Sequence, residues 1–175
     1  HYEYSEVARS YVPMHWHGAL ELIYILSGEL TVETEQRRWQ LHAGQCICIS
    51  PYVLHATISL SGNTALLLRI PTEELGDFAP ETRSRQFIWD AETTNPTMMA
   101  AIERVKQKLL QMQHTASSDS PFRDIRMASL LLEITYLLYE EFSCPVTEGS
   151  IFRREKNRQR LSAVIAYTEA HYREN

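Results

Sequence analysis

The sequence lacks several features that would place it in a familiar class of protein. Only three of its 175 residues are cysteines. Their odd number and the absence of CxxC spacing argue against a disulfide framework and for a reducing compartment. No apolar run approaches the roughly 20 residues of a membrane-spanning helix, and the first residues show no basic stretch leading into an apolar one. We therefore expect a cytoplasmic protein without a membrane partner.

The local patterns of several catalytic classes are also missing. No Gly-rich phosphate-binding loop, Ser-His-Asp spacing or pair of catalytic carboxylates stands out. The formal net charge of -5 makes the chain as a whole a poor nucleic-acid binder. What is present is an ordinary globular composition, with 44% hydrophobic and 22% charged residues. The length suits one domain, with or without a small appendage.

Short apolar or alternating segments predict β-structure in residues 1–90. The segments are separated by Gly, Pro and Asn residues, which favour turns. The predicted strands are 7–12, 19–26, 29–33, 38–42, 46–50, 53–60 and 64–70. Their regular spacing favours an antiparallel sandwich or barrel.

The spacing of the apolar residues becomes helical after residue 90. A helix over 96–114 is predicted by one apolar stripe and by Pro96 in its first turn. A second helix over 121–142 carries two apolar stripes, so several of its sides must be covered. The first helix and the barrel can each cover one side. The apolar surface that remains predicts a homodimer through both helices.

A basic segment follows the two helices. Residues 151–160 hold five basic side chains and one acidic side chain, which gives +4, so the rest of the chain carries -9. We interpret residues 146–160 as a solvated basic linker. Apolar residues at helical spacing over 161–175 predict one more amphipathic helix.

Four side chains in the first 60 residues form the most specific pattern: His15, His17, Glu21 and His55, here called the His/Glu quartet. Alternate residues of an extended strand face the same side, so His15 and His17 can converge, with Glu21 joining them after a turn. His55 would come from a neighbouring strand. Three imidazoles and a carboxylate can hold a divalent transition metal with room for water or substrate. Without a metal, the same cluster can bind a polar organic ligand, and both interpretations remain open.

The pattern resembles the two motifs of the cupin family. The matching residues are His15, His17, Glu21 and Gly28 in the first motif and Gly44 and His55 in the second. The Gly that opens the first motif is absent. In the second motif one extra residue precedes Pro51, Val53 replaces a Gly, and the closing Asn is missing. The resemblance implies a small β-barrel with a pocket in its mouth.

A narrower resemblance covers nearly the whole chain. Residues 21–29, 41–45 and 50–55 resemble the sensor domain of the AraC family of transcriptional regulators, and residues 161–172 resemble the first helix of that family's DNA-binding domain. The order of barrel, helix pair and linker is also that of the family. Because two helix-turn-helix units would follow in that family, we expect this chain to be a regulator cut one helix into its second domain.

The fold class expected from these features is mainly β with α, a cupin-like antiparallel β-barrel followed by an antiparallel helix pair. The predicted parts are a ligand-sensing barrel (1–90), a helical dimerisation segment (91–145), a basic linker (146–160) and the first helix of a truncated DNA-binding domain (161–175). The resemblance implies a non-enzymatic regulator that binds a small-molecule effector such as a sugar. It requires no cofactor and contacts DNA only as the full-length protein.

Further candidates flank the quartet. Arg38 and Trp39 begin a predicted strand near the barrel rim, where Arg38 could clamp an anionic or hydroxylated ligand and Trp39 could stack on a sugar. The alternative places Arg38 on the surface and Trp39 in the core. Arg69 is either a pocket charge or a barrel-edge charge. The second functional hypothesis is a metal-dependent cupin enzyme, an oxygenase or isomerase, that uses the His/Glu quartet.

Overall fold

The computed structural model describes residues 1–72, 75–76, 79–146, 167 and 171. The chain divides into two compact units, His1–Cys144 and Pro145–Asn175. The predicted linker and the predicted helix after it lie outside the described residues, apart from Val146, Tyr167 and His171.

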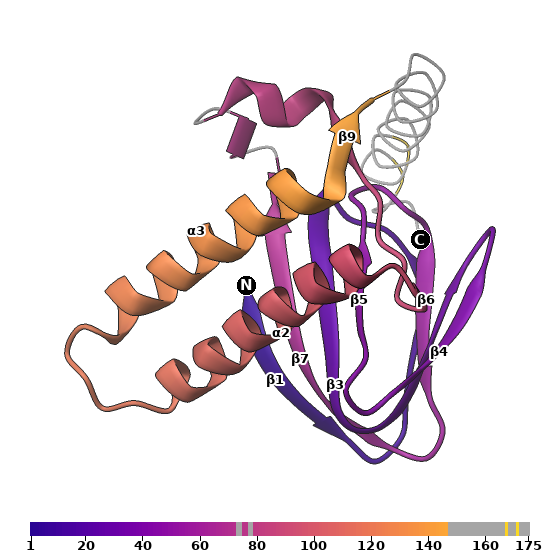
Figure 1. Ribbon diagram of the computed structural model, residues 1–175. Helices are drawn as coiled ribbons and strands as arrows, with labels where there is room; N and C mark the ends of the chain where they lie inside the picture. Colours follow the sequence, from indigo (N-terminus) through magenta and orange to yellow (C-terminus); the bar gives the residue numbers. More distant parts are fainter. Residues whose placement is uncertain (73–74, 77–78, 147–166, 168–170, 172–175) are drawn as a thin grey trace. The chain divides into compact units, whose positions relative to one another are not determined.

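An antiparallel sheet of seven strands curls into a half-barrel in the first unit (Figure 1). The strand order is β1-β7-β3-β6-β2, and β4 and β5 also pair with β3. The strands are β1 (Tyr2–Val7), β2 (Ser10–His15), β3 (Ala19–Thr34), β4 (Arg38–His42), β5 (Cys46–Ile49), β6 (His55–Ser59) and β7 (Asn63–Pro71). With the helix pair that follows, this arrangement confirms the predicted fold class.

The strand β3 runs through both halves of the sheet, where the sequence predicts two strands separated by a turn. Its first part pairs with β5 and β7, and its last part pairs with β4 and β6. The register with β7 shifts between Ile25 and Ser27, and Gly28 has a φ of 74°. A bulge of this kind bends a strand without reversing it, so the predicted break is wrong.

The predicted strand over 7–12 is also wrong, because the chain changes its pairing partner within that segment. The strand β1 ends at Val7 and pairs with β7, whereas β2 begins at Ser10 and pairs with β6. Ala8 and Arg9 connect the two strands. The strands β1 and β2 therefore lie at opposite ends of the strand order.

Two helices, α2 (Pro96–Ala116) and α3 (Arg123–Phe142), lie side by side across one face of the sheet (Figure 1). The predicted start of α2 is confirmed, since the Asn95 side chain accepts hydrogen bonds from the backbone N–H groups of Thr97 and Met98. The helix α3 starts slightly later than predicted, because Pro121 and Phe122 form a turn. No helix among the described residues is long and apolar enough to cross a membrane.

Three further short elements lie outside the seven-stranded sheet and the helix pair. A 3-10 helix, η1 (Pro80–Ser84), precedes β8 (Arg85–Phe87), and β8 pairs with β9 (Ser143–Pro145) in a separate small sheet. The Arg85 guanidinium donates hydrogen bonds to the hydroxyl and carbonyl oxygens of Ser143. These contacts tie the end of α3 to the segment that leaves the barrel.

Both faces of the first part of β3 are buried, because the sheet separates two apolar layers. Leu20 and Leu22 point toward the helices and share a core with Leu109 of α2. Ile23 and Ile25 point the other way, into the barrel. A strand covered on both faces carries a continuous apolar run, as residues 20–25 do apart from one glutamate. That exception, Glu21, is on the barrel side.

Candidate functional site

The structure brings the four residues of the His/Glu quartet together at one end of the barrel. His15 ends β2, His17 lies in the connection to β3, Glu21 is on β3, and His55 begins β6. His15 and His55 are opposite each other in the β2–β6 ladder. One possible metal-ligand atom from each residue lies within 4.8 Å of those of the other three.

The backbone fixes the orientation of each imidazole. Nδ1 of His15 lies 3.0 Å from the carbonyl oxygen of Pro13, Nδ1 of His17 lies 3.0 Å from that of Ala19, and Nδ1 of His55 lies 2.8 Å from that of Val53. A carbonyl oxygen only accepts, so each neutral ring carries its proton on Nδ1. Each Nε2 then holds a lone pair.

Two of these Nε2 atoms face the carboxylate of Glu21. The distances to Oε2 of Glu21 are 2.5 Å from His17 and 3.6 Å from His55. A neutral Nε2 and a carboxylate are both acceptors, so a favourable contact requires a second ring proton or a cation that both can bind. Nε2 of His55 is buried and has no hydrogen-bond partner among the described residues.

Glu21 is ionised although it is only 2% exposed. Burial alone would raise the pKa of this carboxyl group. The contact with His55, the hydrogen bond and positive charge of Arg69 and the hydrogen bond with His17 outweigh burial and lower the pKa to about 2. Glu21 therefore brings a negative charge into the quartet at neutral pH.

This donor set fits a divalent transition metal. Imidazole nitrogen and carboxylate oxygen are ligands for such metals, and ligand histidines usually donate the other ring N–H to a backbone carbonyl or a carboxylate. All three histidines of the quartet make such a contact, because each Nδ1 lies within hydrogen-bond distance of a backbone carbonyl oxygen. The unsatisfied Nε2 of His55 is the atom that a metal would satisfy.

A cavity of about 190 Å³ lies inside the barrel next to the quartet. His15 and Glu21 form part of its wall, and aliphatic side chains such as Ile23 and Leu67 form another part. The other polar side chains of the wall are Glu3, Ser5, Ser10, Thr57, Asn63 and Arg69. The cavity is smaller than the roughly 300–1,000 Å³ of sites for drug-sized ligands, so it suits a small molecule.

The three remaining candidate residues, Arg69, Arg38 and Trp39, do not all lie in the cavity wall. Arg69 is a pocket residue, since it lines the cavity and contacts Glu21. Arg38 is exposed on β4, and Trp39 packs partly against the barrel core beneath the guanidinium of Arg37. Neither Arg38 nor Trp39 is among the residues that line this cavity.

The contribution of β1 to the cavity is missing from the sequence predictions. Glu3, Ser5 and Val7 alternate along β1 and line the cavity. Their period of two is the signal of a strand. It is hard to recognise because the inward side chains are largely polar, and an apolar alternation is what usually marks a strand.

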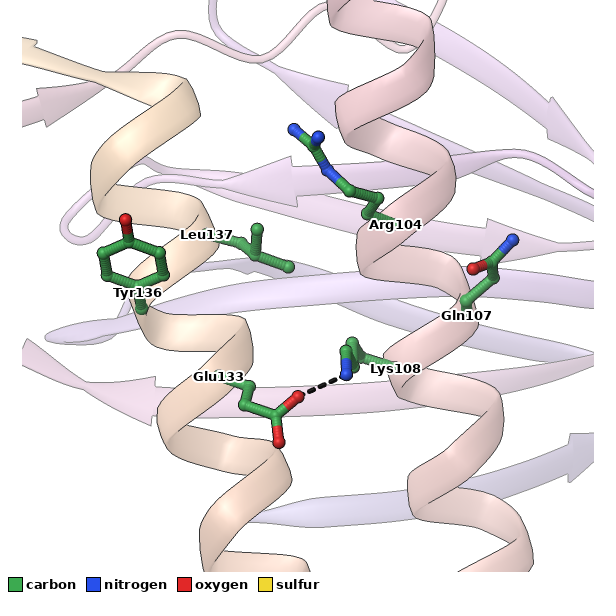
Figure 2. Close-up of a pocket in the computed structure, with 6 residues that line it drawn as sticks. All are labelled: Arg104, Gln107, Lys108, Glu133, Tyr136 and Leu137. Carbon is green, nitrogen blue, oxygen red and sulfur yellow. Dashed lines mark hydrogen bonds and ion pairs between the residues drawn. The ribbon is translucent and has the colours of Figure 1, made fainter.

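A second pocket, of about 210 Å³, lies between α2 and α3 (Figure 2). Arg104, Gln107 and Lys108 line it from α2, and Glu133, Tyr136 and Leu137 line it from α3. Lys108 forms an ion pair with Glu133 across the pocket. Its polar groups are thus largely engaged within the helix pair.

Several solved structures are similar to part of this chain. A cupin-2 domain protein from Shewanella frigidimarina is 18% identical, with a TM-score of 0.36 over 38% of this chain and 65% of that one. A putative ethanolamine utilization protein Q from Salmonella typhimurium is 17% identical, with a TM-score of 0.37 over 40% of this chain and 56% of that one. A DMSP lyase from Ruegeria pomeroyi is 30% identical, with a TM-score of 0.34 over 39% of this chain and 34% of that one.

These likenesses are partial, since the chain spans less than two thirds of the length of each of these three proteins. No curated protein matches the sequence. A family model covers more of the chain than these structures do. The model of the AraC-like ligand binding domain matches residues 2–133, which include the barrel, α2 and the first half of α3. This chain therefore belongs to the family of AraC-like ligand binding domains.

Proposed function

We propose that this chain is the effector-sensing and dimerisation portion of an AraC-type DNA-binding transcriptional regulator. A small metabolite, such as a sugar, binds in the barrel cavity and controls helix-turn-helix units of the full-length protein. The cavity carries the proposal, because it combines aliphatic walls with a few polar groups inside a domain of a ligand-binding family. The effector must bind one conformation better than another to act as a signal. The chain has no catalytic role in this proposal.

Filling the cavity tests this function. Thr57 lines the cavity, whereas Ile58, the next residue of β6, points to the opposite face of the strand. In thermal unfolding with a panel of sugars and small metabolites, we expect at least one compound to raise the midpoint of the wild type and of Ile58→Phe. Thr57→Phe should lose that response. An equal response in Thr57→Phe, or no response to any compound, contradicts the proposal.

DNA binding by the isolated chain is a separate test. We expect no sequence-specific binding of operator DNA by these 175 residues, measured by gel shift at physiological salt, because the proposal assigns to them effector sensing and not DNA recognition. A specific complex would contradict the division of roles between effector sensing and DNA recognition.

The unsatisfied Nε2 of His55 favours a second candidate, a metal-dependent cupin enzyme such as an oxygenase or isomerase. His15, His17, Glu21 and His55 would hold the metal. A divalent metal supplies Lewis-acid activation of a coordinated oxygen. The chain's own residues would orient the metal through the Nδ1 contacts and hold the substrate in the cavity.

Elemental analysis of protein purified without added metal tests the metal site. Stoichiometric iron, manganese or nickel in the wild type, lost in His15→Ala and kept in His114→Ala on α2, supports metal binding by the quartet. Metal that is unaffected by His15→Ala contradicts it. Turnover of a small substrate that requires the bound metal would favour the enzyme over the regulator.

We also propose that a second copy of the chain covers an exposed apolar face of α3. Ile125, Leu132 and Tyr136 are 70%, 58% and 64% exposed and recur at steps of seven and four, so they share one side of the helix. Phe122 extends this side at 68% exposure. Tyr136 of this side also lines the adjoining pocket between α2 and α3, where Lys108 and Glu133 neutralise each other, so the face leaves no net charge there for a second copy to meet (Figure 2).

The oligomeric state tests this interface. A charge in the middle of a buried apolar contact is costly, so Leu132→Lys should convert the dimer to a monomer in sedimentation velocity experiments. Leu60→Lys is the matched control, because Leu60 is 68% exposed and lies in the turn between β6 and β7, not on α3. A wild-type monomer at high concentration, or a dimer that survives Leu132→Lys, contradicts the interface.

A further inference from the structure

Arg69 is the one cationic side chain in the cavity wall among the described residues. It lies on β7 directly opposite Glu21 of β3. Ala65 and Leu67 precede it at alternate positions and also line the cavity. Arg69 therefore lies at the boundary between the aliphatic wall and the His/Glu quartet.

Much of the hydrogen-bonding capacity of Arg69 is unused. Nη2 donates to Oε1 of Glu21 at 3.3 Å. Nε lies 3.3 Å from Oε2 of Glu21, but it is buried and makes no hydrogen bond among the described residues. The guanidinium thus holds the carboxylate of Glu21 with one edge and has donors left for another acceptor.

The charge around Arg69 depends on whether the quartet holds a metal. Glu3, Glu21 and Arg69 together give the cavity one net negative charge. A divalent metal bound by neutral imidazoles and Glu21 changes this to one net positive charge. An anion is then favoured, and a carboxylate matches the planar donor arrangement of a guanidinium.

We infer that the barrel cavity takes a small carboxylate, which Arg69 binds beside a divalent metal held by the His/Glu quartet. This inference rests on the proposed ligand-sensing function and specifies the charge of the ligand. The apolar part of the ligand contacts the aliphatic wall, and the volume of about 190 Å³ limits its size. Arg69 has two roles: it holds Glu21 in place and it binds the ligand.

Calorimetric titration of the Ni²⁺-loaded chain with lactate and lactamide tests the inference. The two compounds have nearly the same shape, and only lactate is charged. We expect lactate to bind about 10-fold or more tightly than lactamide, because hydrogen bonds to charged groups are the stronger ones. The metal-free chain should show no such preference. Arg69→Met should weaken lactate binding by about 10- to 100-fold and leave lactamide binding nearly unchanged.

Two variants control for structure. Arg123→Met removes an arginine that pairs with Asp124 on α3, and it should bind lactate as the wild type does. Arg69→Lys keeps the charge and should retain part of the preference. Circular dichroism and the Ni²⁺ content of each variant separate loss of binding from loss of the fold or of the metal.

The outcomes distinguish this inference from the proposed function. A chain that takes up no Ni²⁺, equal binding of lactate and lactamide, or a preference that survives Arg69→Met overturns the inference. If an uncharged compound binds to the wild type but not to Thr57→Phe, ligand sensing in the cavity still stands. If nothing binds in the cavity at all, both fail.

Discussion

Glu21 links the buried β3 strand to the chemistry of the barrel. Its neighbours on the strand are aliphatic, and its carboxylate is stabilised by groups from three other segments: His17, His55 and Arg69. A buried carboxylate without such partners would become protonated. These partners favour the ionised form of Glu21 more strongly in the fold than water does in the unfolded chain, so the free energy of unfolding must depend on pH.

The metal-free protein should lose stability as Glu21 takes up a proton. Its pKa is about 2 in the fold, below its ordinary value of 4.5. A lowered pKa stabilises the fold above the ordinary value, and this contribution is lost as the pH falls from 4.5 toward 2. The full contribution is about 3 kcal/mol. In urea unfolding, the stability difference between wild type and Glu21→Gln should shrink over this pH range.

The control is Glu35→Gln in the exposed turn between β3 and β4, whose effect should be small at every pH. A constant gap between wild type and Glu21→Gln from neutral pH down to pH 2 would show that the ionised carboxylate does not stabilise the fold.

Local spacing could predict the quartet but not its surroundings. His15, His17 and Glu21 lie within seven residues, and alternation along an extended chain is enough to bring them together. Arg69 reaches Glu21 only through the pairing of β3 with β7, across 48 residues of sequence. Such a register depends on the whole sheet, which is why the sequence leaves open whether Arg69 is a pocket or an edge charge.

At the scale of elements, the bulge in β3 lies where this strand changes its pairing partners. Gly28 lies where the strand passes from one set of neighbours to the other, and its φ of 74° is in the left-handed region. A Cβ atom at this position would lie 2.2 Å from the carbonyl oxygen of Gly62. The bulge thus requires a glycine for both its conformation and its space.

Gly28→Ala should lower the free energy of unfolding by at least about 2 kcal/mol, because left-handed strain and the clash with Gly62 both act on the folded state. Gly44→Ala is the matched control: Gly44 also has a positive φ, of 87°, but a Cβ there meets nothing within 4 Å. Only the conformational cost of about 1–2 kcal/mol applies to Gly44. Urea unfolding measures both, and equal losses would mean that the close approach to Gly62 does not matter.

The elements that the sequence predicts well are those whose ends are marked locally. The strand over 38–42 and the start of the helix at Pro96 are predicted correctly, since a turn or a capping residue marks their ends locally. The division of 19–34 into two strands fails, because Ser27-Gly28 has the composition of a turn and only the sheet makes it a bulge. Strand β1 is missed, because its inward residues are polar.

At the scale of the whole molecule, the barrel and the helix pair share one core. Leu22 and Leu66 of the sheet belong to the same buried cluster as Leu109 of α2 and Leu138 of α3. Trp89 adds a further link, since its ring packs against Phe142 and its indole N–H donates to the carbonyl oxygen of Cys46. The change in composition near residue 90 marks a change of secondary structure within one compact unit, His1–Cys144.

Truncation of a core side chain of α2 should therefore destabilise the barrel as well as the helices. Leu109 is 0% exposed, and Leu109→Ala should cost about 2–5 kcal/mol. The loss should appear equally in helix circular dichroism and in tryptophan fluorescence, because a shared core unfolds cooperatively. Leu110→Ala is the control: Leu110 is 40% exposed, and its truncation should cost much less. If Leu109→Ala lowered the midpoint of the circular dichroism transition and left the fluorescence transition in place, the barrel and the helices would be separate folding units. Ligand binding in the barrel cavity would then need a route to the helices other than the shared core.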